Sequence, residues 1–329
     1  MSGDPDGGLD GFVRQTLQRS GLDRLPAHLE GHYAIRIRAT GELDVGVLRV
    51  DRLDGPSWVA RVFPPARPLE AVEGDARILQ ALERQGFPAE HCATPDPVSV
   101  HEGQGVLVTE LVEGIRADGR GRSFGVLGAL LGALHARTRE TGTAMRRGGA
   151  WHHLSVEGGP REEIAAALSL LDAAREGVPQ TDAALFASVR DELERADTCD
   201  DLPQALIHPD FVPANAIRTP EDSLVMVDWT GAGRGPRLWS LAFLLWAGGA
   251  RDLRLVDVAV THYRRHLQPE PQELARLASA MRVRPLVFDC WAFCMGRRRL
   301  AEVAENIPVT ARLAEAIADR ARQGFGNLS

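Results

Sequence analysis

Residues 206–215 have the sequence LIHPDFVPAN, and residues 225–229 have the sequence VMVDW. The carboxylate of Asp210 is followed five residues later by the amide of Asn215, and a second carboxylate, Asp228, ends an apolar run. Phosphoryl transfer needs a positioned hydroxyl and metal-bridged phosphates, with little covalent chemistry from the protein. Asp210 is suited to orient and deprotonate an attacking hydroxyl, and Asn215 and Asp228 offer the hard oxygens that Mg²⁺ prefers. The two segments therefore predict a magnesium-dependent phosphoryl-transfer site.

The spacing between the two segments also predicts a local structure. Pro209 and Pro213 prevent the loop from continuing as a regular helix or a central strand. Two short apolar runs, 216–218 and 224–227, flank the polar residues 219–223, which is a hairpin pattern. This hairpin would return Asp228 to the neighbourhood of Asn215. The alternative is that these polar residues only cap a loop, fill a turn and end a strand.

At these residues the chain resembles the aminoglycoside phosphotransferase (APH) family, the small-molecule relatives of protein kinases. The family's catalytic loop is His-Gly-Asp-x-x-x-x-Asn, and its metal-binding aspartate lies in an Ile-Asp-Trp-like segment. Here the loop runs from His208 to Asn215 with proline at 209, and Val227-Asp228-Trp229 matches the second segment. Weaker matches are Leu134-His135-Ala136, Gly233–Pro236 and Trp239–Ala242, where Ser240 replaces the family's aspartate.

The resemblance implies an α+β, protein-kinase-like fold with two lobes. We expect residues 1–112 to form an N-terminal nucleotide-binding lobe built mainly on an antiparallel β-sheet. We expect residues 113–329 to form a larger, helical C-terminal lobe for catalysis and substrate binding. A chain of 329 residues also exceeds what one hydrophobic core usually serves. In the C-terminal lobe, the apolar periodicity of 272–298 predicts a helix broken at Pro285.

The resemblance further implies a reaction and its cofactors. ATP, or alternatively GTP, would donate its γ-phosphate to a hydroxyl of a small molecule, with Mg²⁺ held by Asn215 and Asp228. Asp210 would be the catalytic residue that accepts a hydrogen bond from that hydroxyl. His208 would fix the catalytic loop through a hydrogen bond and would not transfer protons.

The chain contains no lysine, because all 38 of its basic residues are arginine. A kinase-like fold normally uses a lysine on its third strand to hold the nucleotide phosphates, paired to an acid on the next helix. Arg61, in the predicted strand 58–63, takes that position here, and a guanidinium binds phosphate well. The resemblance places the paired acid at Asp75, with Glu73 as the second choice. The alternative is that Arg61 is an ordinary strand residue on a solvated face.

Two further nucleotide contacts are predicted in the N-terminal lobe. Residues 40–46, with Gly41 and Gly46, are the candidate loop over the phosphates, placed between strands 33–38 and 45–50. Glycines also suit any β-turn, so an ordinary hairpin is the alternative. The buried strand 105–112 resembles the family's strand and linker at the adenine pocket, where backbone groups of Glu110, Leu111 and Val112 would bind the base.

Composition limits the partners and the compartment. No apolar run reaches the length of a membrane span, and the acidic, glycine-rich residues 1–8 do not resemble a signal peptide. The net charge of −7 gives no basic field suited to nucleic acid. Four scattered cysteines predict buried thiols and not a disulfide framework. We therefore expect a cytoplasmic enzyme that binds neither membrane nor nucleic acid; its oligomeric state does not follow from the sequence.

Two other functions are compatible with the sequence. One is a metabolite kinase on the same scaffold, acting on choline, homoserine, a thio-sugar or a fructosamine. The other is a catalytically silent nucleotide-binding protein, suggested by the missing lysine, by aspartate at 75 and by serine at 240. An antibiotic such as an aminoglycoside is the further candidate acceptor, although the chain shows no strongly acidic field for a polycation.

Overall fold

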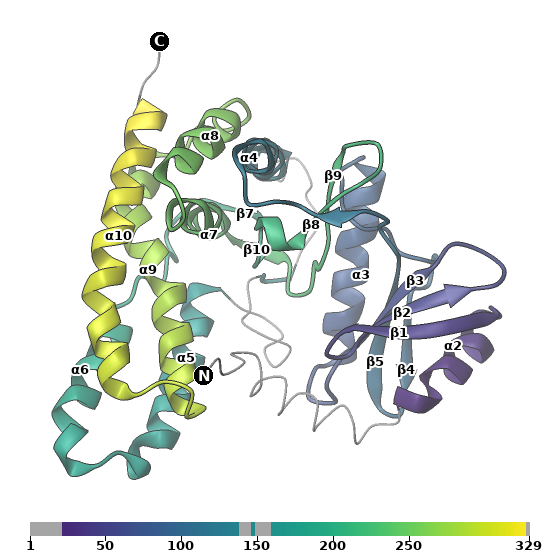
Figure 1. Ribbon diagram of the computed structural model, residues 1–329, viewed down its shortest axis with the longest axis horizontal. Coiled ribbons are helices and arrows are strands. Elements are labelled where there is room, and N and C mark those ends of the chain that lie inside the picture. Colours follow the sequence, from purple (N-terminus) through teal and green to yellow (C-terminus); the bar gives the residue numbers. More distant parts are fainter. Residues whose placement is uncertain (1–21, 138–145, 149–158, 327–329) are drawn as a thin grey trace. The chain divides into compact units, whose positions relative to one another are not determined.

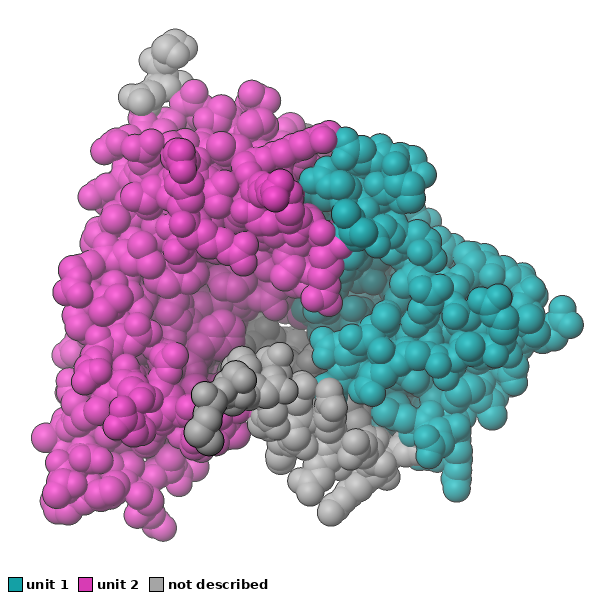
Figure 2. Space-filling model, in the orientation of Figure 1, with its two compact units in different colours: residues 1–115, 152–156, 217–230 teal, residues 116–151, 157–216, 231–329 magenta. Residues whose placement is uncertain are grey.

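The computed structural model describes residues 22–137, 146–148 and 159–326 (Figure 1). They form two compact units, which are described separately (Figure 2). Of the described residues, unit 1 comprises 22–115 and 217–230, and unit 2 comprises 116–137, 146–148, 159–216 and 231–326. Unit 1 carries an antiparallel sheet and unit 2 is mainly helical, which confirms the predicted α+β, protein-kinase-like class.

The units do not coincide with the predicted lobes. The main division falls at 115/116, close to the predicted 112/113, but 217–230 groups with unit 1 although the prediction placed it in the C-terminal lobe. The cause is a set of backbone contacts within unit 1. Glu90 N–H donates to Met226 O at 2.9 Å, and Met226 N–H donates to Pro88 O at 2.9 Å. These bonds attach the hairpin to the segment that follows the first long helix of unit 1.

Unit 1 is built on a five-stranded antiparallel sheet in the order β1-β2-β3-β5-β4. Its strands are β1 (Ile37–Asp44), β2 (Val47–Arg52), β3 (Trp58–Val62), β4 (Val98–His101) and β5 (Gln104–Glu110), and its helices are α2 (Leu25–Tyr33) and α3 (Leu69–Arg84), preceded by the 3-10 turn η1 (Leu22–Arg24). The first predicted strand, 33–38, is therefore wrong at its start, because Tyr33 ends α2 and β1 begins at Ile37.

The two faces of this sheet pack against different helices. Trp58, Ala60 and Val62 of β3 form one core cluster with Leu25 and Leu29 of α2. On β5, a Cβ at Gly105 would lie 2.9 Å from the side chain of Val72 in α3, so the other face is covered by α3. Side chains alternate between the faces of a strand, and all five residues of β3 are consequently buried. Arg61 faces away from the α2 side of the sheet.

The predicted hairpin is confirmed. It consists of β8 (Ala216–Arg218) and β9 (Leu224–Met226), which are neighbours in a three-stranded sheet completed by β6 (Ile115–Arg116). The polar turn is closed by Thr219 N–H donating to Ser223 O at 2.9 Å. The chain passes between the units within β6 and again within β8.

Unit 2 is a bundle of helices with a short antiparallel ribbon. Its elements are α4 (Gly121–Arg137), α5 (Pro160–Ala174), α6 (Ala183–Glu194), β7 (Gln204–Ile207), β10 (Gly233–Pro236), α7 (Arg237–Gly249), α8 (Leu253–Tyr263), α9 (Pro271–Cys294) and α10 (Leu300–Gly326), with 3-10 turns η2 (Arg175–Gly177), η3 (Gln180–Asp182) and η4 (Pro213–Asn215). Helix α9 packs against α5, α7 and α10, and α4 packs against α8 (Figure 1). Strands β7 and β10 pair antiparallel.

The predicted break at Pro285 is wrong, because α9 continues through it from Pro271 to Cys294. A proline inside a helix costs about 3 kcal/mol, since it removes a hydrogen bond and crowds the preceding turn. Val283, Leu286, Val287 and Cys290 are nevertheless all buried in one core cluster. Packing on both sides of the proline keeps the helix continuous. Among the residues that the structure describes, no helix is both long enough and apolar enough to cross a lipid bilayer.

Candidate active site

Arg61 is a buried cation of unit 1, and it lies between two carboxylates. It is on β3, opposite Val47 of β2 and Leu107 of β5, and is 8% exposed. Its Nη1 lies 3.8 Å from Glu90 Oε1, and its Nη2 lies 3.4 Å from Asp228 Oδ1. Burial lowers the pKa of the guanidinium, but the nearby carboxylates, Asp228 first, raise it by more, so the net pKa is above its usual value. The ordinary, solvated strand position that the sequence also allowed does not fit this burial.

Glu90 was missed by the sequence analysis. It lies between α3 and β4, is 3% exposed, and connects three parts of unit 1. Its Oε1 accepts a hydrogen bond from the Asp228 N–H at 2.7 Å, and its Oε2 accepts one from Thr109 Oγ1 at 3.0 Å. Its carboxylate also pairs with Arg61. No motif surrounds Glu90, so the role comes entirely from tertiary contacts.

Asp75, the predicted partner of Arg61, is placed differently. Its carboxylate accepts a hydrogen bond from Arg67 Nη2 at 2.6 Å, and both residues are buried. The carboxylates within ion-pair distance of Arg61 are those of Glu90 and Asp228. Asp75 still acts on Arg61 through its charge, which contributes to the raised pKa of the guanidinium. Asp75 is one methylene shorter than glutamate and lies only eight residues from Arg67. It therefore pairs with Arg67 in place of the predicted Arg61.

Asp228 has a special backbone conformation. Its φ is +63°, in the left-handed region, which aspartate tolerates better than most residues. The hydrogen bond from its N–H to Glu90 stabilises this conformation. Its side chain is 42% exposed. The carboxylate is therefore presented to solvent from a backbone that Glu90 holds, which suits a metal ligand.

Gly41 lies in a strand and not in the predicted loop. It belongs to β1 and is opposite Arg49 of β2, and the turn between the strands falls at residues 45 and 46. Gly46 takes the positive φ, +69°, that this turn requires. The antiparallel pairing of β1 and β2 extends through residues 40–44, which the sequence analysis assigned to a loop. A phosphate contact by Gly41 stays a prediction.

The predicted adenine-binding segment is partly occupied by internal hydrogen bonds. Glu110 N–H donates to His91 O at 2.9 Å, and Leu111 N–H donates to Ser57 O at 2.9 Å. These two amide groups are therefore used by unit 1 itself. Within the described part of the chain, the Val112 N–H makes no hydrogen bond. Of the three predicted amide groups, that of Val112 is the one left for a ligand.

In unit 2, strand β7 leads directly into the catalytic loop. His208 follows β7, is completely buried, and its Nδ1 accepts a hydrogen bond from the Asp210 N–H at 3.1 Å. Ser240 of α7 donates from its Oγ to His208 O at 2.8 Å. Although the family's aspartate is missing at 240, the serine hydroxyl thus holds the loop from the same helix. The histidine has the geometry of a loop-fixing residue.

Asp210 and Asn215 lie together at the end of this loop. Asn215, in η4, donates from Nδ2 to Asp210 O at 3.1 Å, which leaves its Oδ1 as the atom that could coordinate a cation. The Asp210 side chain is 47% exposed, and its Oδ1 accepts a hydrogen bond from Nη1 of Arg284 in α9. A half-exposed carboxylate with one oxygen held is arranged to accept a proton from a ligand.

Arg284 and Glu163 form a buried ion pair that the sequence analysis also missed. Arg284 is 3% exposed and Glu163, in α5, is 1% exposed, and their side chains hydrogen-bond at 3.2 Å. Burial raises the pKa of Glu163, although Arg284 opposes that rise. A signal existed in the sequence: Ala280, Met281, Val287 and Phe288 flank Arg284 at helical spacing, so its side chain had to lie on the apolar face.

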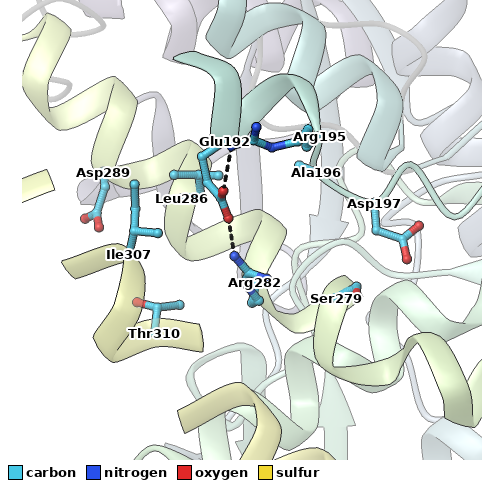
Figure 3. Close-up of a pocket in the computed structure, with 10 residues that line it drawn as sticks. All are labelled: Glu192, Arg195, Ala196, Asp197, Ser279, Arg282, Leu286, Asp289, Ile307 and Thr310. Atoms are coloured by element: carbon cyan, nitrogen blue, oxygen red, sulfur yellow. Dashed lines mark hydrogen bonds and ion pairs between the residues drawn. The ribbon is translucent and has the colours of Figure 1, made fainter. Parts of the chain in front are cut away.

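A separate cavity of unit 2 is not the catalytic pocket. It has a volume of about 70 Å³ and lies where α6, α9 and α10 meet (Figure 3). Among the charged side chains that line it, Arg282 of α9 pairs with Glu192 of α6. Small-molecule sites measure about 300–1,000 Å³, so this cavity has room for water and not for a nucleotide.

Asn215 and Asp228 each carry an oxygen atom of the kind that Mg²⁺ binds. Asn215 offers an amide oxygen in unit 2 and Asp228 a carboxylate in unit 1, both of them the hard oxygen ligands that Mg²⁺ takes. Over the described ranges, no group of three or more His, Cys, Asp and Glu side chains could hold a metal ion. Magnesium usually keeps several waters and binds substrate phosphates, so one or two protein ligands suffice.

One known family has a profile that covers most of this chain. The profile of the Phosphotransferase enzyme family (APH) matches residues 39–278. No curated protein matches the sequence.

Solved structures share the fold along nearly the whole chain. An amicoumacin kinase, hAmiN, in complex with AMP-PNP, Ca²⁺ and Ami, is 14% identical, with a TM-score of 0.66 over 93% of this chain and 96% of that one. Choline kinase LicA from Streptococcus pneumoniae is 17% identical, with a TM-score of 0.58 over 92% and 98%. An aminoglycoside phosphotransferase from Alicyclobacillus acidocaldarius is 18% identical, with a TM-score of 0.58 over 90% and 96%.

Proposed function

Because the chain belongs to the phosphotransferase enzyme family and is a small-molecule kinase, we propose that it transfers the γ-phosphate of ATP to a hydroxyl of its acceptor with the help of Mg²⁺. The observation that carries this proposal is Asp210, a half-exposed carboxylate on a loop held by His208 and Ser240. GTP is the alternative donor.

Unit 1 supplies the nucleotide contacts in this proposal. Arg61 binds phosphate oxygens, because its guanidinium is charged and lies at ion-pair distance from its carboxylates without a short hydrogen bond. Val112 N–H binds the base edge. Arginine therefore takes the place of the usual lysine, and Glu90 takes the place of the usual acid on the helix.

Asn215 and Asp228 are the proposed ligands of Mg²⁺. When bound, the ion would neutralise the charge that develops on the phosphates. The backbone of Asp228 is held by Glu90, and the amide of Asn215 is oriented by its hydrogen bond to Asp210 O. Each ligand is thus fixed within its own unit before the ion binds.

Asp210 orients the acceptor hydroxyl. Its carboxylate accepts the hydrogen bond of that hydroxyl and receives the proton as the oxygen attacks the γ-phosphorus. Because phosphoryl transfer passes through a loose transition state, orientation by Asp210 matters more than early proton removal. His208 keeps the loop in place and transfers no proton.

The acceptor is a hydroxylated metabolite or a weakly charged antibiotic in this proposal. A polycationic aminoglycoside needs unpaired acidic side chains close to the reacting hydroxyl. The acid that lies closest to Asp210 in this network, Glu163, is buried and paired with Arg284, so it offers no charge to a polycation. The four cysteines carry free thiols, which is typical of a reducing cytoplasm.

The test is a phosphoryl-transfer assay with Mg·ATP and a panel of antibiotics and hydroxylated metabolites. The product is detected by mass spectrometry as the gain of one HPO₃ group. We expect Asp210→Asn to lower turnover by about 10²–10⁴ while leaving nucleotide affinity nearly unchanged. Asp257→Asn is the matched control, because Asp257 is a carboxylate of α8 that pairs with Arg320.

Three outcomes are informative. A product made by the wild type and by Asp257→Asn, but not by Asp210→Asn, supports the proposal and identifies the acceptor class. Unchanged turnover in Asp210→Asn would remove that residue from the mechanism. Failure of the wild type to bind either Mg·ATP or Mg·GTP would contradict the proposal altogether.

A further inference from the structure

Arg284 reaches the catalytic loop from a helix that is distant in sequence. Its Nη1 donates to Pro209 O at 2.7 Å and also to Asp210 Oδ1. Its Nη2 donates to Glu163 Oε1 at 3.2 Å. One guanidinium therefore holds the backbone before Asp210, the carboxylate of Asp210, and a buried acid on α5.

The guanidinium is itself fixed by its surroundings. Its central carbon lies 4.3 Å from the ring centroid of Phe243, 5.6 Å from that of Trp239 and 6.0 Å from that of Phe288. Cations are attracted to aromatic rings within about 6 Å, and more strongly when they are desolvated. Burial lowers the pKa of Arg284, but Asp210 and Glu163 raise it by more, so the group stays charged. A buried charge with three rings and two acids around it has little freedom to move.

This arrangement leaves the two oxygens of Asp210 unequal. Oδ1 is bound by Arg284, whereas Oδ2 makes no hydrogen bond with any described residue. The side chain is 47% exposed, so the second oxygen remains accessible to a ligand. The loop is held in parallel by Ser240, which binds the carbonyl of His208, so two consecutive carbonyls are anchored by α7 and α9.

We propose that Arg284 is a positioning residue for Asp210: it binds one carboxylate oxygen and the preceding carbonyl, and so presents the other oxygen to the acceptor hydroxyl. Glu163 balances the charge of Arg284 and acts only through it. This inference rests on the proposed function, because it assigns Arg284 a role in the reaction of Asp210. A lysine could not replace it fully, because a single ammonium lacks the planar fork that reaches three acceptors.

The first test compares conservative variants of two buried pairs. Arg284→Lys keeps the charge and removes the fork, and we expect kcat to fall about 10- to 100-fold with the KM values for ATP and acceptor unchanged. Arg237→Lys is the matched control: Arg237 of α7 is 2% exposed and its Nε donates a hydrogen bond to buried Glu273 at 2.9 Å, and among the described residues its side chain makes no hydrogen bond to residues 208–215. We expect the control to lower the melting temperature and to keep kcat.

A second variant separates positioning from folding. Arg284→Met alone leaves Glu163 as an unpaired buried charge, and the resulting loss of stability would obscure the effect on kcat. The double variant Arg284→Met/Glu163→Met removes both charges, and such replacements of buried pairs are often tolerated. We expect it to fold with kcat still reduced at least tenfold. Wild-type kcat in the folded double variant would overturn the proposal.

A third measurement does not depend on activity. Hydrogen exchange of the amides of residues 208–215 reports whether the catalytic loop is held. We expect faster exchange in the double variant and no change in Arg237→Lys. If the wild type phosphorylates no acceptor, the proposed function fails, and this measurement still decides the role of Arg284. Unchanged exchange at 208–215 in the double variant would refute it.

Discussion

Two buried arginines, one in each unit, are each placed between two carboxylates, yet they bind them differently. Arg61 lies 3.8 and 3.4 Å from Glu90 and Asp228, which are ion-pair distances and not short hydrogen bonds. Arg284 donates hydrogen bonds to Glu163, to Asp210 and to a backbone carbonyl. Both guanidinium groups have raised pKa values, because the attraction of their carboxylates exceeds the effect of burial.

The difference lies in how firmly each guanidinium group is held by its neighbours. The donors of Arg61 are directed at acids that have other hydrogen-bond partners, since Glu90 also binds the Asp228 N–H and Thr109. Arg61 can therefore turn to a phosphate without leaving Glu90 unpaired. Arg284 has no such freedom, because the Glu163 carboxylate has no other hydrogen-bond partner among the residues that the structure describes. The two buried guanidinium groups carry the same charge, but hydrogen bonds hold Arg284 more firmly than Arg61.

The largest expected effect concerns the free energy of unfolding without nucleotide. Arg284→Met should lose about 3–5 kcal/mol, because it leaves Glu163 as an uncompensated buried charge. Arg61→Met should lose only about 1–2 kcal/mol, because Glu90 keeps its hydrogen bonds to Asp228 and Thr109. Urea titration of both variants at pH 7.5 measures the difference. Equal losses would show that the two arginines do not differ in this way.

Nucleotide binding should show the reverse order. Arg61→Met should weaken the binding of a non-hydrolysable ATP analogue by about 30- to 100-fold, because a charge-assisted phosphate contact is lost. Arg61→Lys should recover most of that loss, since an ammonium restores the charge. Isothermal titration calorimetry gives both values, with Arg284→Lys as the control that should bind normally. Tight binding by Arg61→Met would exclude Arg61 from the phosphate site.

Asp228→Asn tests the acid that Arg61 shares with the proposed metal. Asparagine tolerates the positive φ at this position, so the backbone should be preserved. We expect about a tenfold rise in the Mg²⁺ concentration needed for half-maximal nucleotide binding, because a carboxylate ligand becomes a neutral amide. Binding of nucleotide without metal is the control and should not weaken. An unaltered Mg²⁺ requirement would remove Asp228 from the metal site.

The smallest expected effect is a dependence of folding stability on pH that comes from buried His135. Burial lowers the pKa of His135 from 6.5 to about 3, with Arg237 as a second cause, and the ring hydrogen-bonds Tyr263. Between those pH values the unfolded chain binds a proton that the folded protein does not, so stability falls as pH falls. The loss is about 0.8 kcal/mol at pH 6.

His135→Gln should flatten this dependence. Urea titrations between pH 7.5 and 5 would measure the slope of stability against pH in both proteins. An unchanged slope in the variant would show that another group titrates in this range.

Local patterns were predicted well because short-range chemistry determines them. The hairpin at 216–226 follows from two apolar runs around a polar turn, and the structure closes that turn through Thr219 and Ser223. The strand that carries Arg61 and the helix that carries Asp75 also lie where alternation and helical spacing placed them. The α+β fold class, which the resemblance to the APH family implied, is confirmed as well.

The charge pairs could not be predicted because they connect distant segments. Glu90 hydrogen-bonds Asp228, which is 138 residues away in the sequence, and Arg284 hydrogen-bonds Glu163, which is 121 residues away. Nothing near Glu90 in the sequence indicates a buried acid. For Arg284 the apolar flanks indicated burial, but the partner acid depends on how α5 packs against α9. Asp75 shows the same limit, since the helix was predicted correctly and its hydrogen-bond partner was not.

Arg61 on β3 also limits which covalent probes can label the protein. Covalent nucleotide analogues that acylate a phosphate-binding ε-amine have no target here, because the chain has no lysine and Arg61 remains protonated. A survey of cellular kinases with amine-directed probes would therefore pass over this protein even if it binds nucleotide as proposed. Reagents directed at guanidinium groups, with nucleotide protection as the readout, are the suitable chemistry for labelling it.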